Sequence, residues 1–387
     1  MQFNHKTILI ISPNSWGKLH VSKHHYALEL IKKGNIVYFL NPPKTTNANK
    51  IEIIAEAENL FLVNYKTFFP YKIRFHFRNI YNFLMKYQVL KILRAIDKKL
   101  DIVWCFDFNL FSDLRIFKAP LKIYHPVDPV VFPFQINPAK TADIVLSISE
   151  KIKSNFKHIH TPSYFINHGV EEHFKNFAEN RLNNLTNTIS KPLKVGYFGN
   201  LLRPIINEDI LLKIIEDNQE IEFHFWGPHS IENNNLAGSQ FDKSELSNKL
   251  IQKLNVKLHG SKNKMDLIKE IEDIDVFLLL YIKNNTDSDR SNSHKLIEYL
   301  STGKVTVSNQ FSTYLNLKDL IVMPEIDDDN IIPELFLRVA SNLEYFNNVE
   351  LQRKRIEFAL DNTYEKQIKR IEKLHDLVKP ASNKIKD

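Results

Sequence analysis

The chain has 387 residues, 43% hydrophobic and 25% charged, which excludes a disordered protein and gives enough length for two domains. Its single cysteine, Cys105, excludes an internal disulfide framework and a cysteine metal cluster, and no apolar run approaches the roughly 20 residues of a membrane span. The net charge of +7 indicates an anionic partner, which leaves nucleic acid, an anionic membrane surface and phosphorylated small molecules open.

The first half of the chain alternates short apolar runs with segments of helical spacing. Because the first apolar run begins almost at once, it is too short for a signal-peptide core, and we expect a cytoplasmic protein. A helix is predicted over Val21–Lys33, ended by Gly34. The predicted strands are Ile8–Ile11, Ile36–Leu40, Glu58–Val63, Ile102–Phe106, Leu121–Tyr124, Ile144–Ile148 and Ser163–Ile166.

A basic, aromatic segment interrupts this pattern between Asn64 and Lys99. It holds nine Lys or Arg residues against one acid, Asp97, a net charge of +8. Aromatic residues interleaved with cations are typical of a protein that lies on an anionic membrane surface. The same composition suits single-stranded nucleic acid, but no nucleic-acid motif accompanies it, so we expect no nucleic-acid partner. An ordinary helix with solvated lysines and buried aromatic residues is the alternative.

The pattern lapses into an Asn-rich stretch between Glu171 and Lys191, which we interpret as a linker. A second series of alternating elements follows it. Its predicted strands are Lys194–Phe198, Glu222–Trp226, Val256–His259, Val276–Tyr281 and Val305–Ser308, and its helices include Asn207–Glu216, Lys264–Glu272 and His294–Ser301. A last helix is predicted over Tyr364–Val378. The fold class predicted is α/β, with two doubly wound, Rossmann-like domains.

Glycines close several strands of the second half, at Gly199, Gly227 and Gly260. A parallel sheet binds ligands at the carboxyl ends of its strands, where glycine lets the backbone approach a phosphate. Arg203 follows the first of these turns and could clamp a diphosphate, or it is a solvated surface arginine. The turn is not GxGxxG, which disfavours an NAD-dependent dehydrogenase.

The strongest local pattern runs from Ser291 to Ser308 and predicts a capped helix followed by a strand. Lys295 and Glu298, three residues apart, lie on adjoining surfaces in its first turns. Lys295 could meet a phosphate and Glu298 could accept hydrogen bonds from both hydroxyls of a ribose. The alternative is a surface Lys–Glu pair without a ligand.

The pattern around residues 293–307 resembles the donor-site helix of GT-B glycosyltransferases of the group 1, family 4-like type. Further segments resemble that family in the expected order: Ala142–Ser149, Tyr164–Val170 with Phe174, Val256–Gly260, Lys264–Glu272, Asp275–Leu280 and Thr363–Gln367. The resemblance implies two domains that face a cleft. The N-terminal, acceptor-side domain is expected in 1–170, a linker in 171–192 and the nucleotide-sugar-binding domain in 193–362. A C-terminal helix in 363–387 is expected to cross back to the N-domain.

The resemblance also implies the activity: transfer of a sugar from a UDP- or GDP-type nucleotide sugar to a saccharide or lipid-linked acceptor, in surface polysaccharide or glycoconjugate synthesis. It implies retention of configuration and no metal or other cofactor, so the DxD-like Asp287–Asp289 is interpreted as a loop. Donor-binding residues are then expected at Gly199, Asn200, Arg203, Gly227, Gly260, Arg290, Ser293, His294, Lys295 and Glu298.

Two positions depart from the family pattern. Arg290 stands where many members carry a second glutamate, and Asn200 stands at the position of a usual arginine. Arg203 could replace that arginine, and Arg290 could add a phosphate contact. Because of Arg290, a catalytically silent sugar-nucleotide-binding or partner protein is the main alternative, and a nucleotide-sugar epimerase is a third.

On the acceptor side, the family resemblance places Gly17 and His20 of the first loop at the cleft. It also points to His125, which follows the predicted strand Leu121–Tyr124, as a catalytic residue. A histidine there could transfer a proton or bond a sugar hydroxyl, or it is simply packed. Asp128 could orient His125 or contact the acceptor, or it only forms the turn before Pro129. A lipid-linked acceptor would place the enzyme on the cytoplasmic face of the membrane.

Overall fold

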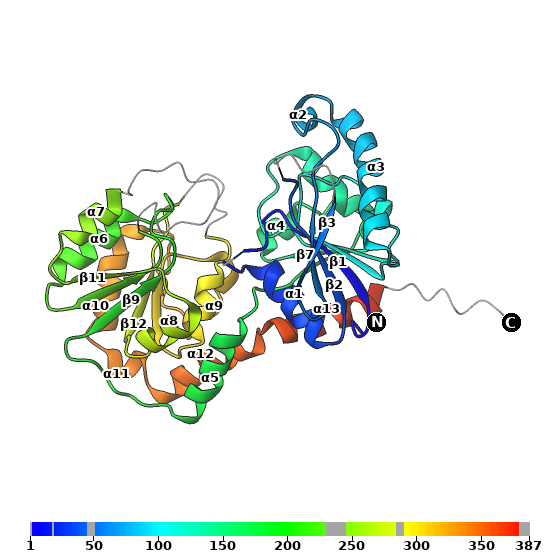
Figure 1. Ribbon diagram of the computed structural model, residues 1–387. Helices are drawn as coiled ribbons and strands as arrows, with labels where there is room; N and C mark the ends of the chain where they lie inside the picture. Colours follow the sequence, from blue (N-terminus) through cyan, green and yellow to red (C-terminus); the bar gives the residue numbers. More distant parts are fainter. Residues whose placement is uncertain (1, 18, 45–50, 230–244, 284–289, 379–387) are drawn as a thin grey trace. The chain divides into compact units, whose positions relative to one another are not determined.

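A computed structural model describes residues 2–17, 19–44, 51–229, 245–283 and 290–378. The chain forms two compact units, one of residues 1–167 with 364–387 and one of residues 168–363. We call them the N-terminal and C-terminal units. Each is built on its own sheet, packed between helices (Figure 1).

The N-terminal sheet has the strand order β3-β4-β2-β1-β5-β6-β7-β8. All neighbours are parallel except β3 and β4, an antiparallel pair. The strands are β1 (Thr7–Ile11), β2 (Ile36–Leu40), β3 (Glu52–Ala57), β4 (Leu60–Asn64), β5 (Ile102–Cys105), β6 (Leu121–Tyr124), β7 (Ile144–Ser147) and β8 (Ser163–Phe165). The helices are α1 (Ser22–Lys32), α2 (Ile73–His76), α3 (Arg78–Ile96), α4 (Glu150–Ser154) and α13 (Tyr364–Val378), with 3-10 turns η1 (Leu114–Phe117) and η2 (Pro133–Thr141).

Both faces of this sheet are apolar, as the strand sequences predict. Along β1, Ile8 and Ile10 pack with α1 and α13, while Leu9 and Ile11 pack on the opposite face with α3. Side chains alternate along a strand, so a strand without polar positions requires cover on two sides. The terminal helix α13 therefore completes the N-terminal unit.

The C-terminal sheet is wholly parallel, with the order β11-β10-β9-β12-β13. Its strands are β9 (Lys194–Phe198), β10 (Glu222–Trp226), β11 (Val256–Gly260), β12 (Val276–Leu279) and β13 (Val305–Ser308). Its helices are α5 (Glu172–Asn183), α6 (Glu208–Asp217), α7 (Glu245–Ile251), α8 (Lys264–Ile271), α9 (His294–Leu300), α10 (Ile332–Ala340), α11 (Leu343–Phe346) and α12 (Val349–Asp361), with short turns η4 (Ser312–Tyr314) and η5 (Asp329–Ile331). The order reverses between β9 and β12, where doubly wound sheets bind ligands.

The segment 171–192, expected as a linker, differs from that expectation. It contains α5, whose first turn is capped by the Glu171 carboxylate, which accepts hydrogen bonds from two backbone N–H groups. Phe174 and Ala178, four residues apart, are fully buried on one face of this helix. This apolar face docks the helix in the C-terminal unit, and the Asn-rich composition of the stretch conceals it.

Among the helices within the described ranges, none is both long and apolar enough to cross a membrane.

Candidate functional site

Three glycine turns lie side by side at the carboxyl edge of the C-terminal sheet. The backbone N–H of Gly199 donates to the carbonyl of Trp226 over 2.8 Å, and that of Gly227 donates to the carbonyl of Gly260 over 2.9 Å. Gly227 has φ +135°, and a Cβ on it would lie 1.9 Å from the carbonyl oxygen of Gly199. Glycine at 227 is therefore required for the ends of β9 and β10 to approach each other.

Lys295 of α9 lies across the first of these turns. A Cβ on Gly199 would lie 2.2 Å from Cε of Lys295, so the absence of a side chain at 199 makes room for the lysine. Lys295 is 6% exposed, and its Nζ donates to the Tyr281 hydroxyl over 3.0 Å. An ammonium group is thus held over a glycine turn at the ligand-binding edge of the sheet.

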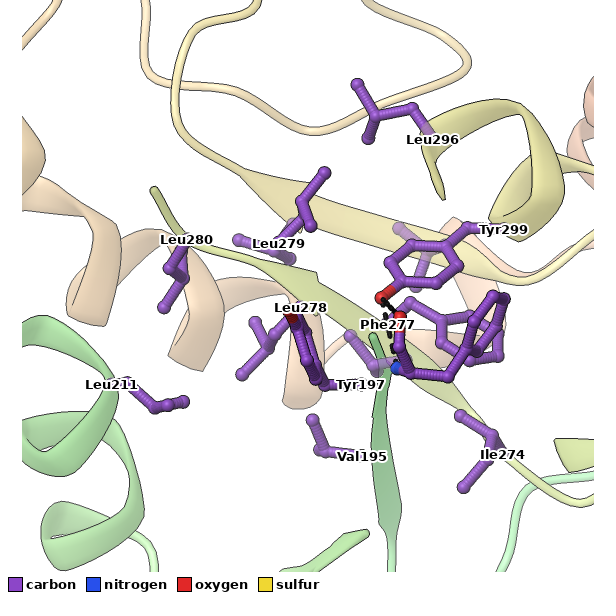
Figure 2. Close-up of a cluster of buried hydrophobic side chains, with 14 of the residues drawn as sticks. Val195, Tyr197, Leu211, Ile274, Phe277, Leu278, Leu279, Leu280, Leu296 and Tyr299 are labelled. Atoms are coloured by element: carbon purple, nitrogen blue, oxygen red, sulfur yellow. Dashed lines mark hydrogen bonds between the residues drawn. The ribbon is translucent and has the colours of Figure 1, made fainter. Parts of the chain in front are cut away.

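Helix α9 is fixed against the sheet by both apolar packing and hydrogen bonds. Leu296, Ile297 and Leu300 are fully buried. The Tyr299 hydroxyl accepts from the N–H of Phe198 over 3.2 Å and donates to the carbonyl of the same residue over 3.3 Å (Figure 2). The position of Lys295 is therefore set by a rigid element rather than by a loop.

Glu298 is the second charged residue of α9, and its side chain is 10% exposed. Its Oε1 accepts a hydrogen bond from Lys264 Nζ over 3.0 Å. Lys264 is the first residue of α8, which Asn263 caps by accepting from the N–H of Asp266 over 3.0 Å. The alternative of a surface Lys295–Glu298 pair is wrong, because both side chains are buried and each bonds elsewhere. The sequence singled out neither Lys264 nor Tyr281 as a site residue.

Cations gather around the first residue of α9. The buried Lys295, the partly buried Lys264 and the exposed Arg203 all lie near the ring of His294. Although the His294 side chain is partly open to solvent, desolvation lowers its pKa well below the ordinary value, and these cations lower it further. Ser293 precedes it at the N-cap position and is 7% exposed, but its side chain makes no capping hydrogen bond, unlike the capped start that the sequence predicts. The surroundings disfavour another cation and favour an anion.

Two residues expected at the donor site have structural roles in the C-terminal unit. Arg290, 4% exposed, donates from Nε to the carbonyl of Tyr281 over 2.9 Å and pairs with the carboxylates of Asp327 and Asp329. This guanidinium holds the chain around η5, and two carboxylates neutralise its charge, which disfavours a phosphate contact. The Asn200 side chain accepts from the N–H of Leu202 over 2.9 Å and forms the turn after β9.

His125, at the carboxyl end of β6, is packed within aromatic rings and is 1% exposed. Its ring stacks on Phe106 with centroids 4.9 Å apart, and Trp104 Nε1 donates to its Nδ1 over 3.3 Å. Because an indole N–H can only donate, Nδ1 carries a lone pair and the proton of the neutral ring is on Nε2. His125 can therefore donate a hydrogen bond to a sugar hydroxyl, but this tautomer does not accept a proton at Nε2.

Asp128 is exposed and lies close to a buried lysine that the sequence did not single out. Lys23 of α1 is 3% exposed and donates to the Asn14 side chain. Burial lowers the pKa of Lys23 to about 8, while Asp128 and the buried Asp107 oppose that shift. A buried lysine within a helix has no signature in sequence, since lysines on helices are usually solvated.

The first loop of the N-terminal unit carries Gly17 and His20. Nothing lies within 4 Å of the position that a Cβ on Gly17 would occupy, so packing gives no reason for glycine there. His20 lies in a row of rings, 4.9 Å from Trp16 and stacked 5.3 Å from His24. His24 is buried, and desolvation foremost lowers its pKa to about 4. His24 is therefore a packed residue.

Within the described part of the chain, no group of three His, Cys, Asp or Glu side chains is arranged to hold a metal ion. The Asp287–Asp289 motif lies outside the described residues.

No protein-family model and no curated protein matches the sequence. Solved structures match over nearly the whole chain. A sucrose-phosphate synthase from Thermosynechococcus elongatus matches with TM-score 0.68 and 12% identity, covering 96% of this chain and 99% of its own. An α,α-trehalose 6-phosphate synthase from Burkholderia multivorans matches with TM-score 0.67 and 11% identity, covering 99% and 100%. Anabaena HepE in complex with UDP and glucose matches with TM-score 0.66 and 13% identity, covering 96% and 100%. The predicted fold class, GT-B with two Rossmann-like domains, is confirmed.

Proposed function

We propose that this protein is a glycosyltransferase that moves a sugar from a UDP- or GDP-type nucleotide sugar to a saccharide or lipid-linked saccharide. The observation that carries the proposal is the arrangement of Lys295 over the Gly199 turn with Glu298 one helical turn further along α9. The names of the similar structures, which include UDP, glucose and sugar-phosphate synthesis, support it. The acceptor class and a role in surface polysaccharide or glycoconjugate synthesis rest on the family resemblance of the sequence.

Each donor-site residue has a distinct task in this proposal. The Glu298 carboxylate accepts hydrogen bonds from the two ribose hydroxyls, and Lys264 holds it in place from α8. The backbone at Gly199, Gly227 and Gly260 lets the diphosphate approach the sheet, with Ser293 and His294 beside it at the start of α9. Lys295 and Arg203 are the cations for the phosphates.

The chemistry assigned to these cations is stabilisation of the leaving group. When the bond between the sugar and the nucleoside diphosphate breaks, negative charge grows on the diphosphate. Cations already in place stabilise that charge more in the transition state than in the ground state. Retention of configuration and turnover without a metal are part of the proposal, and turnover that survives EDTA would agree with the second.

On the acceptor side, His125 donates from Nε2 to a hydroxyl of the reacting sugar. Replacement of His125 with alanine is expected to lower kcat at least about tenfold, because a hydrogen bond made in the transition state is lost, while donor affinity stays unchanged. Steady-state kinetics measure kcat, and titration with the donor measures its affinity in the same variant. An unchanged kcat in a folded His125→Ala protein would remove His125 from the mechanism, and Asp128→Asn tests the second acceptor-side residue in the same assay.

The silent-protein alternative was suggested by Arg290, whose guanidinium is tied to Asp327 and Asp329. A turnover assay with a panel of nucleotide sugars, with and without saccharide acceptors, separates the candidates. Transfer or donor hydrolysis supports the glycosyltransferase. Tight binding without turnover supports the silent protein, and an altered sugar in the absence of any acceptor reveals an epimerase.

A membrane surface is proposed as a further partner, through α2, α3 and the segment before them. Ile80, Phe83, Tyr87 and Leu90 recur three or four residues apart along α3 and are 36–55% exposed. Phe68, Phe75 and Phe77 are also exposed, and Lys72, Lys86 and Lys91 lie exposed among them. The alternative in which the aromatic residues are buried holds only for some, such as Tyr81. Exposed rings flanked by lysines suit the interface of an anionic bilayer.

The proposed membrane surface can be tested by flotation of the protein with lipid vesicles. The full chain is expected to float with vesicles that contain anionic lipid at low salt and to lose that binding as salt rises, since each surface cation contributes about 1 kcal/mol that salt screens. Phe83→Ser with Tyr87→Ser should abolish flotation. Phe132→Ser, which removes an equally exposed ring elsewhere in the N-terminal unit, is the matched control. No flotation of the unaltered protein at low salt would contradict the membrane contact.

A further inference from the structure

Two arginines of the N-terminal unit carry buried hydrogen-bond donors that no described residue satisfies. They are Arg74 of α2 and Arg78, the first residue of α3. The Nε of each is buried, and no hydrogen-bond acceptor for it is found in the described part of the chain. An unsatisfied buried donor on a charged group costs more free energy than one on a neutral group, so an acceptor from outside the chain would offset a real penalty.

Aromatic rings hold both guanidinium groups in place. The Cζ of Arg74 lies 3.9 Å from the ring centroid of Tyr71, and that of Arg78 lies 4.4 Å from the ring centroid of Phe134. Arg78 Nη2 also donates to the carbonyl of Asn109 over 2.7 Å. Stacking uses the faces of a guanidinium. On the N–H edges, Arg74 Nη1 donates to the Tyr71 hydroxyl, while the Nε of each arginine has no acceptor among the described residues.

Two tyrosine hydroxyls extend this cluster. Tyr81 is fully buried, its ring centroid lies 5.2 Å from Arg78 Cζ, and Tyr65 is 2% exposed. Neither hydroxyl has a hydrogen-bond partner among the residues that the structure describes. Tyr65, the residue after β4, interacts electrostatically with Tyr81, and Tyr81 interacts with both arginines. The four buried polar atoms without partners therefore belong to one cluster.

The charge of the cluster is positive. Within the described ranges, Asp107 is the one carboxylate that acts electrostatically on both arginines, and its Oδ1 already accepts from the backbone N–H groups of Asn109 and Leu110. Two cations face one acid. The missing partner is an anion with several acceptor oxygens, which is the chemistry of a phosphate or a carboxylate.

We propose that Arg74 and Arg78, with the hydroxyls of Tyr65 and Tyr81, bind a phosphate or carboxylate group of the acceptor. The inference rests on the proposed function, because it assigns the anion to the molecule that receives the sugar. The cluster lies beyond the end of β4 and beside Asp107, which follows β5, so it is at the ligand-binding edge of the N-terminal sheet. The acceptor is accordingly a sugar phosphate, an acidic sugar or a saccharide on a lipid phosphate.

The test is calorimetric titration of the full chain with glucose 6-phosphate, glucuronate and, as the neutral control, glucose. Binding of an anionic sugar but not of glucose is expected. Arg74→Gln and Arg78→Gln are each expected to weaken binding of the anionic sugar about tenfold or more, since each removes a hydrogen bond between charged groups. Arg78→Lys keeps the charge but loses the planar guanidinium, so it should also weaken binding. Lys140→Gln, which removes an exposed cation elsewhere in the N-terminal unit, should leave binding of the anionic sugar unchanged.

A second arm identifies the source of the anion. If vesicles with a lipid phosphomonoester bind in an arginine-dependent way while soluble sugars do not, the site stands and the phosphate belongs to a lipid. If neither soluble anions nor such vesicles depend on the two arginines in variants with unchanged circular dichroism, the site is overturned. Nucleotide-sugar binding is measured on the same variants. If the nucleotide sugar binds but the anion does not, only the anion site has failed. If the anion binds but no nucleotide sugar does, the proposed function is overturned and the anion site stands.

Discussion

Replacement of Glu298 with alanine is expected to weaken nucleotide-sugar binding about tenfold or more while the protein stays folded. A hydrogen bond to a charged group contributes about 1.5–3 kcal/mol, and each 1.4 kcal/mol is about tenfold in Kd. The Lys264 side chain left without its partner is 39% exposed, so water can solvate the ammonium and the cost to folding is small. Isothermal titration calorimetry measures the change in Kd, both for the nucleotide sugar that the unaltered protein binds and for the corresponding free nucleotide.

Two further variants make this result specific. Glu298→Gln keeps the shape and one acceptor oxygen, and should weaken binding less than alanine does. Glu272→Ala removes an exposed glutamate of the same unit and should leave binding unchanged. Equal donor affinity in Glu298→Ala and the unaltered protein would show that the ribose is bound elsewhere.

Alanine substitutions in the adjacent glycine turns are expected to have the second large effect. Gly227→Ala should lower the stability of the protein, whereas Gly199→Ala should weaken donor binding. At Gly227, φ is +135° and the new Cβ would meet the backbone oxygen of Gly199 at 1.9 Å. Neither strand end can move without breaking the sheet, so Gly227→Ala is expected to lower the free energy of unfolding by about 3 kcal/mol or more. At Gly199 the Cβ would meet Cε of Lys295 at 2.2 Å.

A lysine side chain can move aside, so Gly199→Ala is expected to displace the ammonium and weaken nucleotide-sugar binding with a smaller loss of stability. Lys295→Ala should reproduce its binding defect. Gly17→Ala is the control, since open space surrounds that position. Urea unfolding and calorimetry on the four variants measure the two effects separately. If Gly199→Ala and Lys295→Ala bind donors normally, the lysine does not contact the diphosphate.

The strands of the C-terminal sheet and the helix around Glu298 could be predicted because each is specified by a pattern within a short stretch of sequence. Short apolar runs closed by glycines define a parallel sheet, and residues 291–308 contain a helix, its end at Gly303 and the next strand in one stretch. The sequence placed Gly199 and Lys295 separately among the expected donor-site residues, but the contact between them joins two distant elements and was not predicted.

Other features depend on contacts between distant residues, and sequence spacing cannot reveal them. Arg290 is neutralised by Asp327 and Asp329, more than 35 residues further along. Glu298 pairs with Lys264, 34 residues earlier, rather than with Lys295, its neighbour in the same helix. Spacing within a helix indicates which side chains are able to meet, but the sheet order decides which helices are adjacent.

The N-terminal unit was harder to predict at the level of side chains than at the level of strands. The sequence did not predict β3, since most of its residues are exposed and its pattern is weakly apolar. The basic segment was recognised by composition, but composition could not show that Phe83 and Tyr87 are exposed while Tyr81 is buried on the same helix. Only the packing of α3 on the sheet separates its two faces.

The central claim is that the C-terminal unit binds a nucleotide sugar through Glu298 and Lys295. A thermal-shift screen of UDP-, GDP-, ADP- and dTDP-sugars tests it most directly, because binding to the folded state raises Tm without knowledge of the acceptor. We predict that UDP- or GDP-sugars raise the Tm of the unaltered protein and that the shift is lost in Glu298→Ala. No shift with any donor, or an equal shift in the variant, would contradict the claim.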